Sequence, residues 1–271
     1  MWTGENLEDA ARRKVAWLIG VVVVALIAVG GWYWYSSRHA AAAPVAMAPT
    51  PPPAPAASTP PQIAHPLPGE GTGGAALPAL NDSDPVTRDS LIGVLGKAPV
   101  EQFLVPQNIV RHIVVTIDNL PRKKVAVDLR PVKPTPGQTL VTTQGDVTTL
   151  SDANYARYAP LMHVLQSTDV KTLAVVYERL YPLFQQSYED LGYPGKYFND
   201  RLVEVIDHLL QAPEAAGPVP LVQPKVFYEY ADADLEGRSA GQKLLMRMGP
   251  ANERLLKEKL RAFRAEIVKN K

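Results

Sequence analysis

Glu204 and His208 are the first pair of residues whose types and spacing could do chemistry. They are four residues apart, so a helix over about 200–211 would place them on one face, where they could share a metal ion or a proton. A carboxylate-bridged di-iron bundle needs two Glu-x-x-His sets; this spacing is one residue too long, and no second set exists. A hydrogen-bonded group with Arg201 is the alternative, and we expect no bound cofactor.

Serine chemistry has less support in the sequence. Ser239 and Lys243 are four residues apart and loosely match a Ser–Lys dyad, but Ser239 also stands where a helix cap is expected. The glycine-rich run at 69–74 lacks the Gly-Lys-Ser/Thr ending of a phosphate loop. We therefore predict no catalytic residue, and a role other than catalysis is favoured.

Tyrosine-rich groups are better candidates, for a binding site. A tyrosine ring offers a large apolar surface with one polar tip, which suits a groove that stacks sugars or grips a peptide. One turn and one extended pair supply the predicted binding residues, which are Tyr155, Arg157, Tyr158, Tyr228 and Tyr230. The alternative is that these rings belong to the core, with their hydroxyls hydrogen-bonded.

A mainly helical domain over residues 81–271 must position these side chains. Apolar residues recur at helical spacing, and Asp, Ser, Gly and Pro residues mark the ends of the segments. Helices are predicted over about 85–96, 99–104, 106–120, 152–166, 170–191, 200–211, 239–248 and 251–269. Two Thr- and Val-rich runs flank Gln-Gly-Asp within 140–150, which predicts a small β-hairpin, and 219–232 reads as extended.

The segment 170–191 is the most informative of these helices. Its polar residues keep to a narrow strip, while apolar and tyrosine side chains cover the rest, so we expect a central helix. Pro182 lies inside it and predicts a kink, because proline lacks an N–H. Asn199 is expected to cap the helix that follows.

The run at 15–37 has no charged side chain and is long enough to cross a membrane, which takes about 20 apolar residues. It ends in Trp and Tyr at 32–35, typical of an interfacial aromatic belt. Three cations at 12–14 precede it, against Arg38 after it, so residues 1–14 are expected in the cytoplasm. The alternative is a cleaved signal, since the alanines at 40–43 resemble a cleavage site.

Residues 38–80 form a segment rich in Pro, Ala and Gly that reads as a disordered linker. The simplest interpretation is a spacer between the membrane and the domain. The alternative is that its proline-rich part is a ligand for an aromatic-lined groove.

Charge and cysteine content limit the function classes. The chain of 271 residues has 28 basic and 27 acidic residues and no cysteine. This balance gives no sign of a nucleic-acid partner, which calls for a clustered basic surface. Disulfides, thiol chemistry and thiolate metal sites are excluded.

Five segments in this order resemble a known family. They are NLPRKK, NYARYAPL, RLYPLFQQSYEDLGYP, FNDRLVEVIDHLL and SAGQKLLMRMGP. The combination is similar to the bacterial proteins grouped as domain-of-unknown-function family three thousand and fourteen, over about residues 78–268. The resemblance implies a single-pass inner-membrane protein with a Pro-rich linker. It carries no reaction and no catalytic residue.

The resulting hypothesis is a bacterial inner-membrane protein with its helical domain in the periplasm. Its expected partners are the lipid bilayer, through the transmembrane helix, and another envelope protein or cell-wall component. The leading function is a binding or scaffolding module. The alternatives are an envelope enzyme with a noncanonical site around Glu204, Asp207 and His208, and a domain that mainly self-associates.

Overall fold

The computed structural model describes residues 63–67, 76–215 and 217–268. The chain divides into two units, and the first, Met1–Ser58, lies wholly outside the described residues. So do the expected cytoplasmic segment 1–14, the expected membrane span 15–37 and most of the expected linker. In the described part, no helix combines the length and the apolar character that a membrane span requires.

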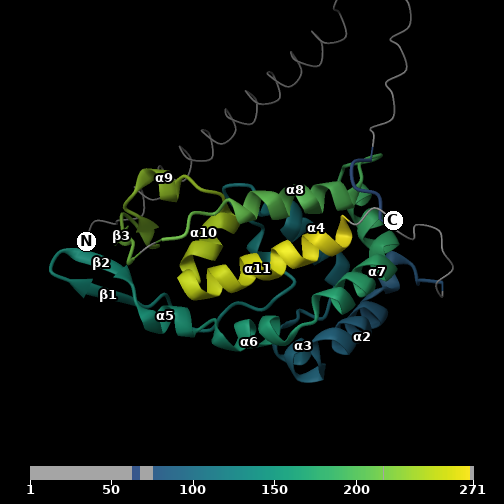
Figure 1. The fold of residues 1–271 in the computed structure, drawn as a ribbon, viewed down its shortest axis with the longest axis horizontal. Helices are drawn as coiled ribbons and strands as arrows, with labels where there is room; N and C mark the ends of the chain where they lie inside the picture. Colours follow the sequence, from purple (N-terminus) through teal and green to yellow (C-terminus); the bar gives the residue numbers. More distant parts are fainter. Residues whose placement is uncertain (1–62, 68–75, 216, 269–271) are drawn as a thin grey trace, which may run out of the picture. The chain divides into compact units, whose positions relative to one another are not determined.

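The described part of the second unit is a mainly helical domain with a small sheet, as the sequence predicts (Figure 1). Its α-helices are α2 (Asp84–Leu95), α3 (Lys97–Phe103), α4 (Ile109–Asn119), α5 (Asp152–Ala156), α6 (Ala159–Ser167), α7 (Val170–Asp190), α8 (Phe198–Leu210), α9 (Ala233–Glu236), α10 (Ala240–Arg247) and α11 (Pro250–Ile267). Two short 3₁₀ helices complete the set: η1 (Leu80–Asp82) precedes α2, and η2 (Val127–Leu129) follows α4.

Helix starts follow capping chemistry. Ser151 accepts a hydrogen bond from the Asn154 backbone N–H at the start of α5, and Ser239 does the same for α10. Asp169 caps α7 by accepting from two backbone N–H groups of its first turn. Asn199 does not cap α8, contrary to the sequence expectation, because the helix already begins at Phe198 and Asn199 is fully buried within it.

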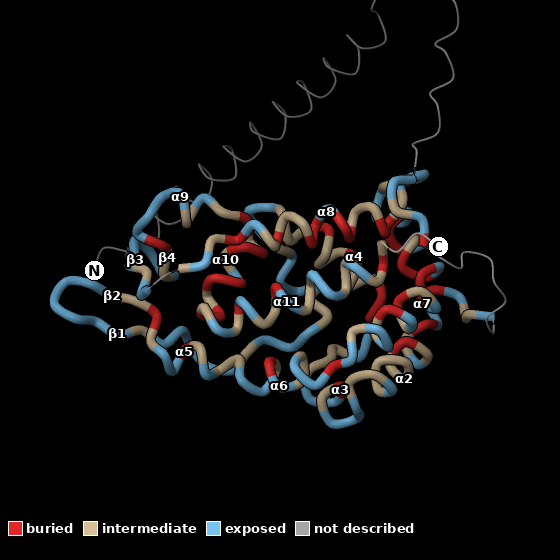
Figure 2. The backbone as a smooth tube through the Cα atoms, in the orientation of Figure 1, coloured by how far each residue is buried: buried red, intermediate tan, exposed pale blue. Residues whose placement is uncertain are grey.

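The long helix α7 is central, as predicted. It packs against α4, α8 and α11, and the main hydrophobic core forms around its buried face. Figure 2 shows buried residues concentrated on α7 and α8. The largest enclosed side chains of this core include Leu180, Tyr181, Phe198 and Ile206. Pro182 lies inside α7 at an exposed position.

The sheet is larger than the predicted hairpin. Strands β1 (Val141–Gln144) and β2 (Val147–Leu150) form that hairpin, and β3 (Pro220–Val222) and β4 (Glu229–Tyr230) extend it in the antiparallel order β1-β2-β3-β4. Leu221 lies opposite both Thr148 and Tyr230. A second small core of Leu150, Leu221, Tyr230 and Met246 joins this sheet to α10.

The predicted helix over 152–166 is two helices in the structure. α5 ends at Ala156, and α6 begins at Ala159 with Pro160 in its first turn. Proline fits the first turn of a helix, where its missing N–H leaves no bond unmade, but it disrupts a helix interior. The short helix α9 has no counterpart in the sequence prediction.

Candidate functional site

A cavity of about 490 Å³ opens where α7 ends and α8 begins. Its lining combines three tyrosines, two cations and three carboxylates: Asp118, Tyr188, Tyr193, Lys196, Tyr197, Asp200, Arg201 and Glu204. We call it the Tyr193 pocket. Most of its residues come from the 191–197 turn and the first turns of α8, and Asp118 comes from α4.

Glycine and glutamine shape the turn that carries the pocket. Gly192 has φ of 108° and Gly195 has φ of 72°, values that favour glycine and let the chain reverse after α7. The amide of Gln185 then spans the turn. Its Nε2 donates to the Lys196 carbonyl at 2.8 Å, and its Oε1 accepts from the Phe198 backbone N–H at 2.8 Å.

Asp118 is the buried charge at the base of the pocket, with only 3% of its surface exposed. Arg201 donates through Nε to its carboxylate at 3.0 Å and through a terminal nitrogen to its backbone carbonyl at 3.0 Å. Arg122 and the Tyr193 hydroxyl also donate to the carboxylate, the latter at 3.2 Å. A buried carboxylate with this many charge-assisted bonds fixes the side chains around it.

Other groups in the pocket remain available to a ligand. Glu204 pairs with Arg201 through Oε2 at 2.9 Å, yet 68% of its side chain is exposed. The exposed Lys196 ammonium lies 5.4 Å from the centre of the Tyr193 ring, which stacks on Tyr188 at 4.6 Å. Burial raises the pKa of Tyr188 to about 12. The pocket thus offers one cation, one carboxylate and aromatic faces together.

Residues 63–67, which we call the strap, bind beside the pocket. The Asp200 carboxylate accepts from the backbone N–H groups of Ala64 and His65 at 3.0 and 2.7 Å. The Tyr197 hydroxyl accepts from the Leu67 N–H at 3.0 Å. Leu67 is 6% exposed and belongs to the main core. The strap lies within the segment 38–80 that the sequence predicts as linker, and Tyr197 and Asp200 serve both the strap and the pocket.

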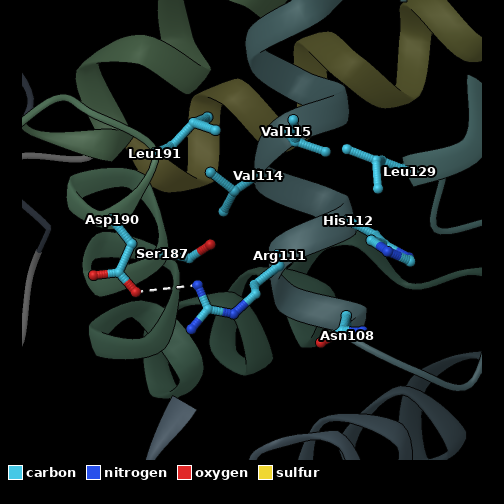
Figure 3. Close-up of a pocket in the computed structure, with 9 residues that line it drawn as sticks. All are labelled: Asn108, Arg111, His112, Val114, Val115, Leu129, Ser187, Asp190 and Leu191. Atoms are coloured by element: carbon cyan, nitrogen blue, oxygen red, sulfur yellow. Dashed lines mark hydrogen bonds and ion pairs between the residues drawn. The ribbon is translucent and has the colours of Figure 1, made fainter. Parts of the chain in front are cut away.

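A second cavity, of about 270 Å³, lies between α4 and α7 (Figure 3). Arg111 points across it to Asp190, with the two charged groups 3.1 Å apart, and a second nitrogen of Arg111 bonds Asn81 at 3.0 Å. Its remaining lining is mostly apolar. Its charged groups hold α4, α7 and η1 together, and the buried Nδ1 of His112 in its lining has no hydrogen-bond partner in the described structure.

Glu204 and His208 lie in different surroundings in the structure. Glu204 faces the Tyr193 pocket, whereas His208 Nε2 lies 2.9 Å from the buried Ser239 hydroxyl on α10. Burial lowers the pKa of His208, and the nearby Arg201 lowers it further. Within the described ranges, no three His, Asp or Glu side chains gather as a metal site. Ser239 and Lys243 have different side-chain partners. The Ser239 hydroxyl contacts His208, whereas the Lys243 ammonium pairs with Glu236.

The predicted tyrosine site lies at the sheet end of the domain. Tyr155 and Tyr228 pack against the small core that contains Tyr230, which is 3% exposed. Arg157 donates instead to the carbonyls of Pro136 and Gly137 at 2.9 and 2.8 Å. Tyr158 precedes α6 and is partly buried. Three of the five predicted residues therefore come together, as a packed cluster rather than an open groove.

A family model described as "Protein of unknown function (DUF3014)" matches residues 109–264, more than half of the chain. The chain belongs to this family. Comparison with the curated proteins and with the solved structures finds no match. All residues of the Tyr193 pocket lie within the DUF3014 region, whereas the strap and α2 precede it.

Sequence reasoning did not predict the Tyr193 pocket as a site. It did expect a hydrogen-bonded group of Arg201 with Glu204, and the structure contains that ion pair. It missed Asp118, which pairs with Arg201 across 83 positions of sequence. The available signal was the NLPRKK segment, whose Arg122 lies one helical turn from Asp118. It also missed Lys196, which carries no motif.

Proposed function

We propose that this protein is a membrane-tethered binding module of the bacterial cell envelope, and that it holds its partner at the Tyr193 pocket. The partner is another envelope protein or a cell-wall component. The anchor at 15–37, the inner-membrane location and the periplasmic position of the domain belong to this proposal and rest on the sequence.

The composition of the Tyr193 pocket carries the proposal. Interfaces are enriched in tyrosine and arginine, and binding energy concentrates where rigid aromatic rings stand beside charged groups. Here the rings are fixed before any partner arrives, because Tyr193 stacks on Tyr188 and bonds Asp118. A site that needs little reordering loses less entropy on binding.

An enzymatic role that joins Glu204 and His208 has less structural support. Catalysis at Glu204 and His208 would need the two groups to act on one substrate. Glu204 faces the pocket and pairs with Arg201, whereas His208 is turned to Ser239 on α10. Glu204 is better suited to holding a partner through a charge.

In-cell photocrosslinking tests the proposal. A photoreactive residue replaces Lys196 in the full-length chain, and the crosslinked species are identified by mass spectrometry. A matched variant carries the same residue at Asp146, an exposed position in the β1–β2 turn. We expect one dominant envelope protein or cell-wall fragment from position 196 and none from 146. Equal products from both positions, or none from 196, would contradict the proposal.

A further inference from the structure

The strap has the geometry of a bound peptide. We infer that Tyr197, Asn199 and Asp200 form a peptide-binding site which the strap occupies, and that a partner protein's segment with the strap's chemistry takes its place. This inference rests on the proposed function, because it names how the partner is held next to the Tyr193 pocket.

The site binds the strap mainly through its backbone. Asp200 accepts from two successive N–H groups, those of residues 64 and 65, and Tyr197 accepts from that of residue 67. Asn199 donates to the carbonyl of residue 65 at 2.9 Å. Contacts of this kind fit many sequences and set the conformation of the bound chain, as in other modes of peptide recognition.

Side chains add two requirements to this backbone pattern. Leu67 is buried in the main core, whereas Ile63 is 46% exposed and Ala64 and Pro66 are also exposed. Pro66 stands between two hydrogen-bonded N–H groups and has none of its own to leave unsatisfied. The ligand class is therefore a polypeptide segment with two successive free N–H groups, then proline, then a large apolar residue.

The receptor side of the site is built into the domain. Asn199 is fully buried, accepts from the Tyr177 hydroxyl at 3.1 Å and also donates to the Ile267 carbonyl at 3.2 Å. Its backbone N–H donates to the Tyr181 hydroxyl at 3.3 Å. These contacts do not involve the strap, so they hold the receptor in place when the strap leaves. The family region 109–264 contains the receptor and not the strap.

Attachment in cis favours the strap over any free competitor. A ligand tethered by a short segment has an effective concentration of about millimolar, and a free peptide must compete with it. A partner peptide therefore binds more readily when the contacts between the strap and the site are weakened. Weakening the strap should therefore raise the affinity for an added peptide, whereas weakening the receptor should abolish binding.

Fluorescence anisotropy tests this exchange with the full-length chain in detergent micelles. The probe is a labelled peptide of sequence TPPQIAHPLPGE, residues 59–70. Leu67→Ser removes the buried anchor of the chain's own strap, and we expect it to strengthen probe binding about tenfold or more over the wild type. Ala64→Pro removes an N–H donor and gives a second, independent strap variant. Asp200→Ala, added to either variant, should abolish binding, as should Leu→Ser within the probe.

Each outcome decides the inference. Probe binding to strap variants that Asp200→Ala removes supports it, provided that thermal unfolding shows the variants folded. No probe binding to either folded strap variant, or binding that Asp200→Ala leaves unchanged, would overturn it. If the wild-type chain forms dimers and the probe dissociates them, the site binds a second copy of this chain. That result would overturn the inference that a partner protein is the ligand. Crosslinking from position 196 does not depend on the strap, so the proposed function can survive the failure of this inference.

Discussion

The two ends of this domain are both rich in tyrosine, yet they differ in what surrounds the rings. At the sheet end, Tyr230 is buried and its hydroxyl has no hydrogen-bond partner in the described structure. The Tyr155 ring packs so closely on Gly249 that a β-carbon there would lie 2.5 Å from it. At the α7–α8 end, Tyr193 lies beside an open cavity, with its hydroxyl bonded to Asp118 and Arg122.

This difference shows that tyrosine content alone does not identify a binding surface. The sheet end uses the rings as apolar volume, so a ligand would have to displace packed side chains. The α7–α8 end holds its rings with a buried charge and leaves Lys196 and Glu204 free to face a partner. The substitutions below compare matched positions, from the largest expected effect to the smallest.

Removal of Asp118 should have the largest effect. Asp118→Ala removes the buried one of the two carboxylates that pair with the partly buried Arg201, and breaking a buried ion pair in this way costs about 3 kcal/mol or more of unfolding free energy. Glu204→Ala is the control on the same arginine, and its exposed carboxylate should contribute less than about 1 kcal/mol. Chemical denaturation of both variants measures the difference. Equal losses would show that Asp118 does not organise the pocket.

Glycine positions compare the packing of the two ends. Gly249 and Gly192 both have positive φ, 88° and 108°, but only Gly249 has a neighbour in the way of a β-carbon. Gly249→Ala should cost about 3 kcal/mol, from backbone strain plus collision with Tyr155, and Gly192→Ala about 1 kcal/mol, from strain alone. Thermal unfolding separates the two. A cost at Gly192 as large as that at Gly249 would contradict the contrast between packed and open ends.

Hydroxyl deletions compare the rings themselves. Tyr193→Phe removes bonds to Asp118 and Arg122 and should cost about 1 kcal/mol. Tyr230→Phe removes a buried hydroxyl that has no hydrogen-bond partner in the described structure, so the expected change is about zero or slightly stabilising. Denaturation midpoints measure both changes. A larger loss of stability from Tyr230→Phe than from Tyr193→Phe would contradict the conclusion that the Tyr193 hydroxyl is the one held by hydrogen bonds.

The smallest effect concerns pH and His208, on the helix that runs from the pocket towards α10. Burial lowers the pKa of His208 in the folded chain, so the unfolded chain binds the proton more readily. The stability that neutral His208 contributes is complete above its unfolded pKa of about 6.5 and is lost as the pH falls below it. His208→Gln should make the melting temperature less dependent on pH between about 7.5 and 5.5. A variant with the wild-type pH dependence would contradict this.

The sequence predicted local features better than contacts between distant segments. The extent of α7, the caps Ser151 and Ser239 and the hairpin all follow from periodicity and capping chemistry over a few residues. Whether a tyrosine faces a core or a cavity depends on which distant segment covers it. Tyr230 is covered by α10 and the sheet, whereas Tyr193 meets α4 through Asp118.

The strap illustrates the same limit. Its sequence, Ile-Ala-His-Pro-Leu, carries no periodicity and lies in a proline-rich segment, so composition alone reads it as spacer. Its order comes from Asp200, more than 130 positions away in the chain. The sequence allowed the alternative that part of the linker is a ligand, but it did not indicate which residues would bind that ligand.

Lysine footprinting in intact cells tests most directly whether the α7–α8 end is the binding end. A small amine-reactive reagent labels the chain in cells and after purification, and mass spectrometry compares the exposed Lys196 at the pocket with the exposed Lys225 at the sheet end. We predict that Lys196 is labelled several-fold less in cells than in the purified protein, while Lys225 is labelled equally in both. Protection of Lys225 with full labelling of Lys196 would contradict the account.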